Sequence, residues 1–238
     1  MQALIFAGGK GTRLLPDTAT VPKPMLRIAG VPLLEILLRQ LARQGFREVV
    51  LALGHLPEVV TNFVGDGARF GVHMQTLCEN EPLGTAGAIA LALPHLGENF
   101  LTLNGDLLTT MDFAAFADQH RRLGADVSMA IARRAVRSAF GVIQHDDDLR
   151  FLDYFEKQTR FETISLGCYV FRKAAIEALL SQPERIDMPE LMLRLRDARA
   201  DVRCVVQECA WYDIGQPDDY RRAQEWFVQA RGEILPGA

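Results

Sequence analysis

The chain has 238 residues, of which 49% are apolar and 24% charged, values that are ordinary for a folded globular protein. Acidic side chains outnumber basic ones by 30 to 26, which gives a formal charge of −4. A protein that coats nucleic acid needs a basic excess to neutralise phosphates, so no nucleic-acid partner is expected. No apolar run approaches the roughly 20 residues that a membrane-spanning helix requires, so no membrane partner is expected either.

The N-terminal segment and the cysteines both indicate a cytoplasmic protein. Met1–Gly9 has neither a basic first part nor a long apolar stretch, so it is not typical of a signal peptide. The four cysteines, at positions 78, 168, 204 and 209, form no CxxC pair, and the closest two have no histidine nearby. We therefore expect buried or inert thiols, no metal centre built on cysteine, and a cytoplasmic location.

Short apolar runs alternate with amphipathic stretches in the first part of the chain. Strands are predicted over Gln2–Ala7, Glu48–Leu53, Val72–Leu77, Phe100–Leu103 and Val127–Ala132. Helices are predicted between them, over Val31–Gly45, Glu58–Val64, Thr85–Leu93 and Phe113–Leu123. This alternation is typical of βαβ units, whose parallel strands form a sheet covered by helices on both faces.

Beyond residue 140 the pattern changes to strands linked by polar turns. Strands are predicted over Gly141–Gln144, Leu149–Phe155, Ser165–Phe171 and Val202–Glu208, and helices over Lys173–Ser181, Pro189–Ala198 and Asp218–Arg231. The acidic triplet Asp146–Asp148 is interpreted as a hairpin turn. With no internal repeat or linker, and no hexapeptide repeat of a C-terminal β-helix, we expect one α/β domain over residues 1–238, with halves 1–135 and 136–238.

A glycine-rich turn follows the first predicted strand. It holds three glycines in four positions together with two basic residues, namely Gly8, Gly9, Gly11, Lys10 and Arg13. Glycines let backbone N–H groups approach a phosphate, and the basic side chains add charge-assisted hydrogen bonds. The turn is not a P-loop, and Leu14 replaces the third glycine of the dinucleotide fingerprint, which argues against an NAD-dependent dehydrogenase. The alternative is a tight turn with solvated basic residues.

Three further charged side chains lie in restrained or apolar settings. Lys23 lies between two prolines, which hold the backbone extended. Asp106 follows a predicted strand, at the edge where open α/β sheets bind ligands. Asp213 lies among aromatic and apolar neighbours, where a carboxylate needs a partner or a metal. Read together, the two aspartates fit Mg²⁺, which takes one or two carboxylates along with substrate phosphates. The alternatives are a surface lysine and a turn-forming Asn-Gly-Asp.

In this order, six segments resemble the motifs of the sugar-1-phosphate nucleotidyltransferases. They are GGKGTRL at 8–14, VPKPM at 21–25, EPLGTAGAI at 81–89, NGD at 104–106, FEKQ at 155–158 and WYDIGQPDDY at 211–220. Two positions depart from the family pattern: Gln158 stands where proline is usual, and Ser165 where many members have asparagine. The motif sequences are most similar to those of mannose- and heptose-1-phosphate guanylyltransferases, and they are also similar to those of single-domain N-acetylmuramate-1-phosphate uridylyltransferases.

The resemblance implies an enzyme that joins an NTP and a sugar 1-phosphate into an NDP-sugar and pyrophosphate with Mg²⁺. It implies a single-domain, Rossmann-like α/β/α sandwich with a mainly parallel, mixed central sheet, in which residues 1–135 bind the nucleotide and 136–238 the sugar. Arg13, Lys23 and Asp106 are the expected catalytic residues, and Asp106 and Asp213 the metal ligands. The implied nucleotide-binding residues are Ala7, Gly8, Gly9, Lys10, Gly11, Thr12, Arg13, Glu79, Glu81, Pro82, Gly84 and Thr85. The implied sugar-phosphate residues are Lys23, Asn104, Gly141, Glu156, Lys157, Ser165 and Gly167.

The choice of base is expected to depend on Glu79 or Glu81. A carboxylate accepts hydrogen bonds, and guanine offers it two adjacent donors, whereas uracil and thymine offer one N–H between two carbonyls. GTP is therefore favoured if a carboxylate reads the base. If backbone groups read it, the alternative is a uridylyltransferase that makes UDP-N-acetylmuramate or a related UDP-sugar.

A non-catalytic subunit that binds nucleotide sugars is the alternative of another class, because a fold does not fix a function. Such a subunit would be expected to lose Arg13, Lys23 or an aspartate, and this chain retains them all. A monomer or a homodimer is expected.

Overall fold

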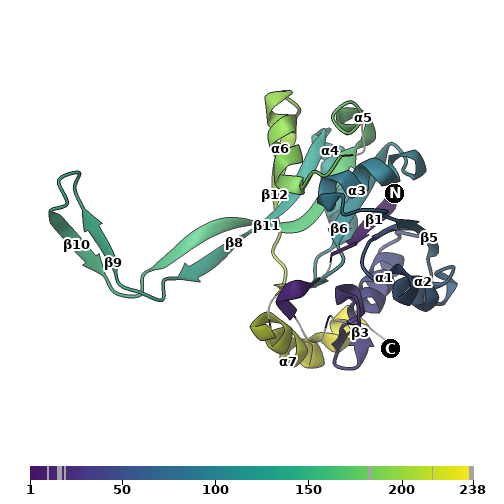
Figure 1. Cartoon of the computed structure of the whole chain (residues 1–238), viewed down its shortest axis with the longest axis horizontal. Coiled ribbons are helices and arrows are strands. Elements are labelled where there is room, and N and C mark those ends of the chain that lie inside the picture. Colours follow the sequence, from purple (N-terminus) through teal and green to yellow (C-terminus); the bar gives the residue numbers. More distant parts are fainter. Residues whose placement is uncertain (10, 15–17, 19, 182–183, 216, 236–238) are drawn as a thin grey trace.

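The computed structural model describes residues 1–9, 11–14, 18, 20–181, 184–215 and 217–235, without the side chain of Thr12 (Figure 1). The strands of its main sheet are β1 (Gln2–Ala7), β4 (Glu48–Leu53), β5 (His73–Cys78), β6 (Asn99–Asn104), β8 (Val127–Arg137), β11 (Thr159–Arg172) and β12 (Val202–Val206). The helices are α1 (Leu33–Arg43), α2 (Pro57–Val64), α3 (Gly84–Ala92), α4 (Phe113–Leu123), α5 (Lys173–Ile176), α6 (Met188–Asp197) and α7 (Pro217–Ile234).

The main sheet has seven strands in the order β12-β8-β11-β6-β1-β4-β5. β11 runs antiparallel to β6 and β8, and the other neighbouring pairs are parallel. The mainly parallel, mixed sheet predicted from the sequence is therefore confirmed. Within residues 1–125, the predicted strands and helices are all present, with ends shifted by no more than two residues.

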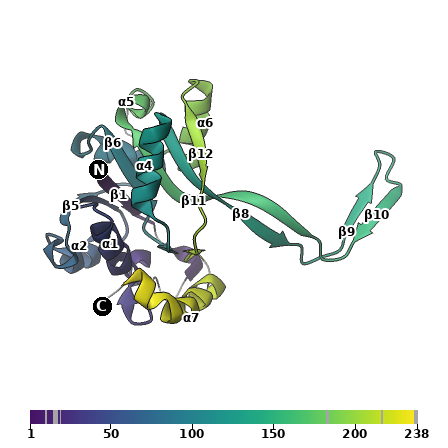
Figure 2. The same ribbon diagram turned by 180° about the vertical axis from the view of Figure 1, so that it is seen from behind.

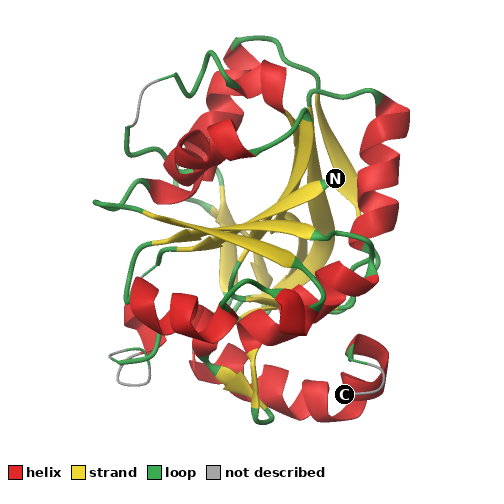
Figure 3. Ribbon diagram, turned by 90° about the vertical axis from the view of Figure 1, so that its right-hand side faces the viewer, coloured by secondary structure: helices red, strands yellow, loops and turns green. Residues whose placement is uncertain are grey.

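The sheet is covered by helices on both faces, as Figure 3 shows. Successive residues of β1 point to opposite faces, so Ala3 and Ile5 pack beneath α1, α2 and α4, while Leu4 packs beneath α3, α5 and α6. A third apolar cluster joins the outer face of α1 to α7 through residues such as Ile36 and Phe227. No helix in the described part of the chain is long and apolar enough to cross a membrane.

Two of the strands extend far beyond the sheet. β8 and β11 remain paired from Val127 and Phe171 in the sheet to Arg137 and Thr159, and beyond them β9 (Val142–His145) and β10 (Phe151–Phe155) form a hairpin. Figures 1 and 2 show this projection clear of the helices and of the rest of the sheet. We call residues 133–163 the arm and the other described residues the body.

The arm differs from the prediction, which ended one strand at Ala132 and began another at Ser165. The sequence did not indicate the extra length because Arg133–Arg137 has no buried face, and apolar alternation is the signal of a half-buried strand. The hairpin turn predicted at the acidic triplet is confirmed, since Asp146 Oδ1 accepts hydrogen bonds from the N–H groups of Asp148 (3.0 Å) and Arg150 (2.9 Å).

Short elements also differ. The helix predicted over Lys173–Ser181 ends at Ile176, where the chain passes into turns. Four strands of two or three residues were missed: β2 (Arg27–Ile28), β3 (Val31–Pro32), β7 (Leu107–Thr109) and β13 (Trp211–Asp213). They form two small antiparallel pairs, β2 with β3 and β7 with β13.

Candidate active site

The glycine-rich turn lies at the carboxyl end of β1 and lines a cleft of about 300 Å³ together with residues that follow β6. A Cβ atom on Gly8 would lie 2.9 Å from the Glu79 carboxylate, and one on Gly105 would lie 2.6 Å from the Phe6 carbonyl oxygen. Glycine is therefore needed at position 105, where the backbone of Phe6 lies too close for a side chain, and Gly8 lies directly against the Glu79 side chain. We call this cavity the nucleotide cleft. The chain leaves β1 toward β4 on one side while β6 lies on the other, which is the place where open α/β sheets bind ligands.

Asp106 and Asp213 lie side by side because of the short β7–β13 pair. Asp213 is in register with Leu107, and the N–H of Ile214 donates a hydrogen bond to the Asp106 carbonyl at 3.0 Å. Lys23 lies between the two acids: its ammonium group is bonded to the Asp106 carboxylate and is 3.7 Å from Asp213 Oδ1. Two acids 107 positions apart in the sequence thus share one lysine.

The two carboxylates are not fully satisfied by this lysine. Asp106 Oδ1 and Asp213 Oδ1 are buried and find no hydrogen-bond partner among the residues that the structure describes. Burial and the charge of Asp106 raise the pKa of Asp213 above its usual value, and Lys23 and Arg13 oppose that rise. Two orphaned carboxylate oxygens beside each other are a donor set that fits Mg²⁺. Within the described residues, no cluster of three or more potential metal ligands occurs. The remaining ligands would therefore come from substrate phosphates and water.

The opposite side of the cleft carries the predicted base-reading residues. Glu79 Oε2 accepts a hydrogen bond from the N–H of Leu83 at 3.1 Å, and burial raises the pKa of the Glu79 carboxyl. Glu79 lines both the nucleotide cleft and an adjoining cavity of about 550 Å³, which Glu81 also lines. Glu79 is thus half-buried between the two cavities, whereas Glu81 is exposed. The predicted nucleotide-binding residues that line the cleft together are Ala7, Gly8, Gly9, Glu79, Pro82, Gly84 and Thr85.

Part of the predicted sugar-phosphate set lies next to Asp106. Asn104 lines the nucleotide cleft. Gly167 in β11 lies against the Asn104 side chain, so closely that a Cβ on Gly167 would lie 2.5 Å from Asn104 Nδ2. Gly167 has a φ of +70°, within the register shift of β11 between Ser165 and Tyr169. The Ser165 hydroxyl is 2.8 Å from the Tyr169 hydroxyl. Asn104, Ser165 and Gly167 are thus predicted sugar-phosphate residues that lie in the body.

A basic cavity of about 390 Å³ opens on the other side of Asp213, at the base of the arm. Arg13 lies there, in the single turn of 3-10 helix over Thr12–Leu14 that follows the glycine-rich turn. Trp211 closes the cavity floor, with its indole N–H donating to the Leu166 carbonyl at 2.9 Å. The basic side chains that line it are Arg13, Arg133, Arg134 and Arg222.

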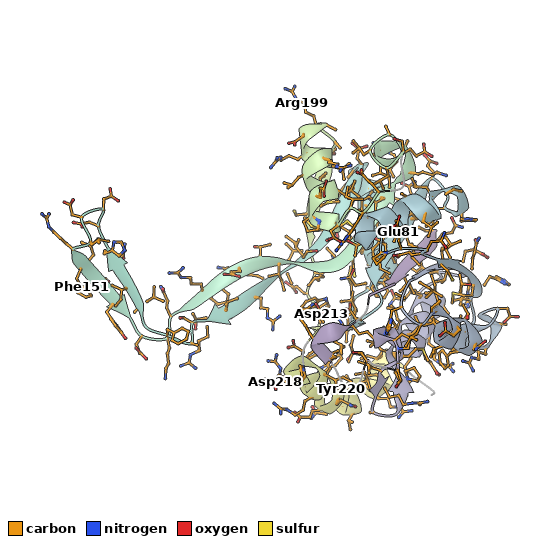
Figure 4. All side chains as sticks on the ribbon, viewed as in Figure 1. Glu81, Phe151, Arg199, Asp213, Asp218 and Tyr220 are labelled. Carbon is orange, nitrogen blue, oxygen red and sulfur yellow. The ribbon has the colours of Figure 1, made fainter. Side chains whose placement is uncertain are left out.

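Three predicted sugar-phosphate residues lie away from the nucleotide cleft. Gly141, Glu156 and Lys157 lie at the bend of the arm between the β8–β11 ribbon and the β9–β10 hairpin. The Glu156 carboxylate accepts a hydrogen bond from the Tyr154 hydroxyl at 3.0 Å, so it is engaged within the arm. Figure 4 shows how far the hairpin, marked by Phe151, extends from Asp213 in the body.

The remaining predicted nucleotide-binding residues lie in the glycine-rich turn itself. Gly11 has a φ of +62°, and a Cβ there would lie 3.4 Å from the Cβ of Lys23. Lys10 and the side chain of Thr12 lie outside the described residues.

The analysis of the sequence missed Arg185 and Asp187. Arg185 lines both the nucleotide cleft and the adjoining cavity. Asp187 accepts a hydrogen bond from the N–H of Thr85 at 3.3 Å, at the start of α3. Both belong to the loop before α6, where no motif or strand end marks them, so their only signal was charge in a loop.

Comparison with known proteins places these features in a family. Residues 2–229 match the family described as "Nucleotidyl transferase". The chain is 34% identical over 233 residues to the mannose-1-phosphate guanylyltransferase of Mycobacterium tuberculosis, covering 96% of this chain and 65% of that protein. It is 32% identical over 242 residues to the UTP–glucose-1-phosphate uridylyltransferase of Synechocystis sp., covering 94% of this chain and 62% of that protein. The chain thus spans less than two thirds of the length of these two relatives.

A solved structure agrees with the fold. HddC from Yersinia pseudotuberculosis, determined in complex with GMP-PN, superposes with a TM-score of 0.74 at 28% identity, covering 95% of this chain and 99% of that one. The family resemblance drawn from the six motifs is confirmed by the match of residues 2–229 and by the guanylyltransferase relative.

Proposed function

The chain belongs to the nucleotidyl transferase family, and from that premise we propose that it transfers a guanylyl group from GTP to a sugar 1-phosphate, mannose 1-phosphate by preference, and releases pyrophosphate. The observation that carries the proposal is that Lys23 and Asp106 line the cleft beside the Gly8–Gly9 turn, with Asp213 next to them, 3.7 Å from the Lys23 ammonium group. Two acids and a lysine next to an exposed glycine backbone suit a triphosphate better than an uncharged ligand.

In this reaction the protein mainly positions the substrates and neutralises their charge, and covalent chemistry by its side chains is secondary. A phosphate oxygen of the sugar phosphate attacks the α-phosphorus of GTP, and the bond from that phosphorus to the pyrophosphate oxygen breaks. Both substrates are anions and repel each other, so the ammonium group of Lys23 neutralises charge where they meet. Arg13, on the far side of Asp213, is placed to accept the leaving pyrophosphate.

Asp106 and Asp213 are the residues that would hold Mg²⁺, through the carboxylate oxygens that lack partners. When bound, the metal ion would neutralise negative charge on the triphosphate. Lys23 would then exchange its bond to Asp106 for bonds to substrate phosphate, which frees both carboxylates for the cation.

Guanine is favoured because Glu79 is held in place at the base side of the cleft. Its Oε2 is engaged by the N–H of Leu83, and its Oε1 faces the turn beside Gly8. A fixed acceptor pairs with the N1–H and N2–H₂ donors of guanine, and facing uracil it would lose a hydrogen bond, at about 1–3 kcal/mol. The names of the guanylyltransferase relative and of the GMP-PN complex support this assignment. The Synechocystis relative supports UTP as the second candidate.

Turnover of a substrate matrix tests the proposal. The four NTPs would be combined with mannose-, heptose-, glucose-, N-acetylglucosamine- and N-acetylmuramate 1-phosphates, with pyrophosphate release as the readout and a reaction lacking sugar phosphate as the control. We expect GTP with mannose 1-phosphate to give the highest kcat/KM. Highest turnover with UTP would contradict the assignment of guanine and make uracil the preferred base. Binding of a nucleotide sugar without turnover of any pair would identify a regulatory subunit instead.

A further inference from the structure

The arm holds most of the large apolar side chains that the described part of the molecule exposes. Of thirteen such side chains, eight lie between residues 136 and 161, although the arm is a small part of the chain. Single exposed apolar residues are ordinary, whereas a concentration of them marks a surface that another molecule covers. The eight are Val136, Phe140, Ile143, Leu149, Phe151, Leu152, Tyr154 and Phe161.

The exposed area is of the size that a stable protein interface buries. The aromatic members are 79%, 66%, 52% and 61% exposed, for Phe140, Phe151, Tyr154 and Phe161 respectively. An aromatic side chain buries ~150–250 Å², so these four alone expose on the order of 500 Å². A standard interface buries about 800 Å² on each partner, and the four aliphatic side chains supply much of the remainder.

Charge along the arm is polarised. Its base carries Arg133, Arg134, Arg137 and Arg160 against one acid, Glu162, and Arg133 and Arg134 line the basic cavity beside Asp213. Its tip is the turn Asp146–Asp148, whose three aspartates are exposed or half-buried and of which one, Asp148, lies 3.6 Å from Arg150. A membrane surface with anionic lipids would repel this tip. A second arm running in the opposite direction would instead present a basic base to each acidic tip.

We propose that two copies of this chain pair through their arms about a two-fold axis, with the hairpin of each copy against the base of the other copy's arm. A two-fold pair uses the same surface twice, so one patch must be complementary to itself. The arm meets that condition, because its apolar side chains run along its length and its two ends carry opposite charge.

Sedimentation velocity at micromolar concentrations tests the pairing without reference to activity. We expect the wild-type chain to be a dimer, and Phe151→Ser to raise the dimer dissociation constant at least about tenfold. Val228→Ser is the matched control, because Val228 is 67% exposed on α7 and Phe151 66% exposed on the arm. A monomeric wild-type chain, or equal dissociation constants for the two variants, would overturn the proposal.

Charge reversal tests the opposed orientation. Changing Asp147 and Asp148 to lysine, or Arg133 and Arg134 to glutamate, should each weaken the dimer, and combining all four changes in one chain should restore it, because both ends are then reversed while Asp146 still holds the turn. A combined variant that is no stronger as a dimer than either parent would refute the antiparallel arrangement.

Discussion

The body and the arm are made of the same kinds of residues but obey different constraints. In the body, strands such as β1 are buried on both faces, and every large apolar side chain of that strand except the half-buried Phe6 is inaccessible to solvent. In the arm, β9 and β10 pair only with each other, and their apolar side chains face solvent. Burial stabilises the body within one chain, whereas the arm keeps its apolar area free for another molecule.

The difference shows how one chain can separate chemistry from association. The nucleotide cleft is built on strand ends and tight turns of the body, where packing holds side chains in place. The arm contributes little to the packing of the body, so its sequence is free to serve a partner. Substitutions in the two regions should therefore affect different measurements, and each prediction below contrasts the two.

The largest effect is expected at the cleft. Asp106→Ala and Lys23→Ala should each lower kcat/KM at least about 1,000-fold, because each removes a charge that the transition state requires, at about 4 kcal/mol. Far-UV circular dichroism should remain that of the wild type. Asp197→Ala, which removes an exposed carboxylate from α6, is the control and should keep wild-type turnover. Near-normal activity in either cleft variant would remove that residue from the mechanism.

The second largest effect is expected on stability, where replacing a core phenylalanine should cost more free energy of unfolding than replacing a phenylalanine of the arm. Phe100 is fully buried and stacks on Phe171 with ring centroids 5.8 Å apart, so Phe100→Ala should lower the free energy of unfolding by about 3–5 kcal/mol. Phe151→Ala should change it by less than about 0.5 kcal/mol when measured on dilute, monomeric protein. Urea unfolding gives both values, and a comparable loss in Phe151→Ala would mean that the arm packs on its own body.

A smaller effect is expected at the base side of the cleft. Glu79→Gln replaces one acceptor by a donor, so the preference for GTP over UTP should fall by about 1–3 kcal/mol, equivalent to about 5- to 150-fold. Competition between the two nucleotides in one reaction measures the ratio directly. Glu81→Gln, at an exposed position of the adjoining cavity, is the matched comparison and should change the ratio less. The reverse order of effects would assign base reading to Glu81.

The hairpin should be dispensable for folding. Arg137 and Thr159 are directly paired, so replacing residues 138–158 by Asn-Gly closes the ribbon with a two-residue turn. The melting temperature of dilute protein should then change by only about 2–4 °C, because the removed residues bury little of the body. A large drop in melting temperature would contradict the separation of body and arm.

The pH dependence of stability should come partly from His120 in α4. It is buried, its ring bonds to Ser128 at 2.9 Å, and burial lowers its pKa below the usual value. The unfolded chain therefore binds this proton at a higher pH than the folded chain, and stability falls as pH drops below about 6.5. His120→Gln should flatten this part of the profile, whereas His145→Gln in the arm should leave it unchanged. Equal slopes in both variants would exclude His120 as the cause.

The sequence indicated the body well because burial leaves periodic signals. Glu48–Leu53 and Phe113–Leu123 were predicted with the bounds that the structure has, since one is a continuous apolar run and the other an amphipathic repeat with a glycine after its end. The arm's ribbon was missed because Arg133–Arg137 is exposed on both faces. Its length depends on pairing with residues beyond position 158, which local periodicity does not report.

The candidate site was predictable as a list of residues but not as an arrangement. The motifs named Asp106 and Asp213, yet their proximity depends on three-residue strands too short to leave a pattern. The remoteness of Glu156 and Lys157 from their own cleft followed from the length of the arm, which the sequence did not indicate. Arg185 could not be singled out, because a lone arginine in a loop has many possible roles.

The lysine between the two aspartates has a consequence for the empty enzyme. Two acids in a partly buried position would repel each other, and a resident cation relieves that repulsion before any ligand arrives. The polypeptide therefore supplies its own counterion and should fold and keep its melting temperature in the presence of a chelator. Under the proposed function, a dependence on magnesium would thereby be confined to catalysis, and heat stability would be a property of the apoprotein.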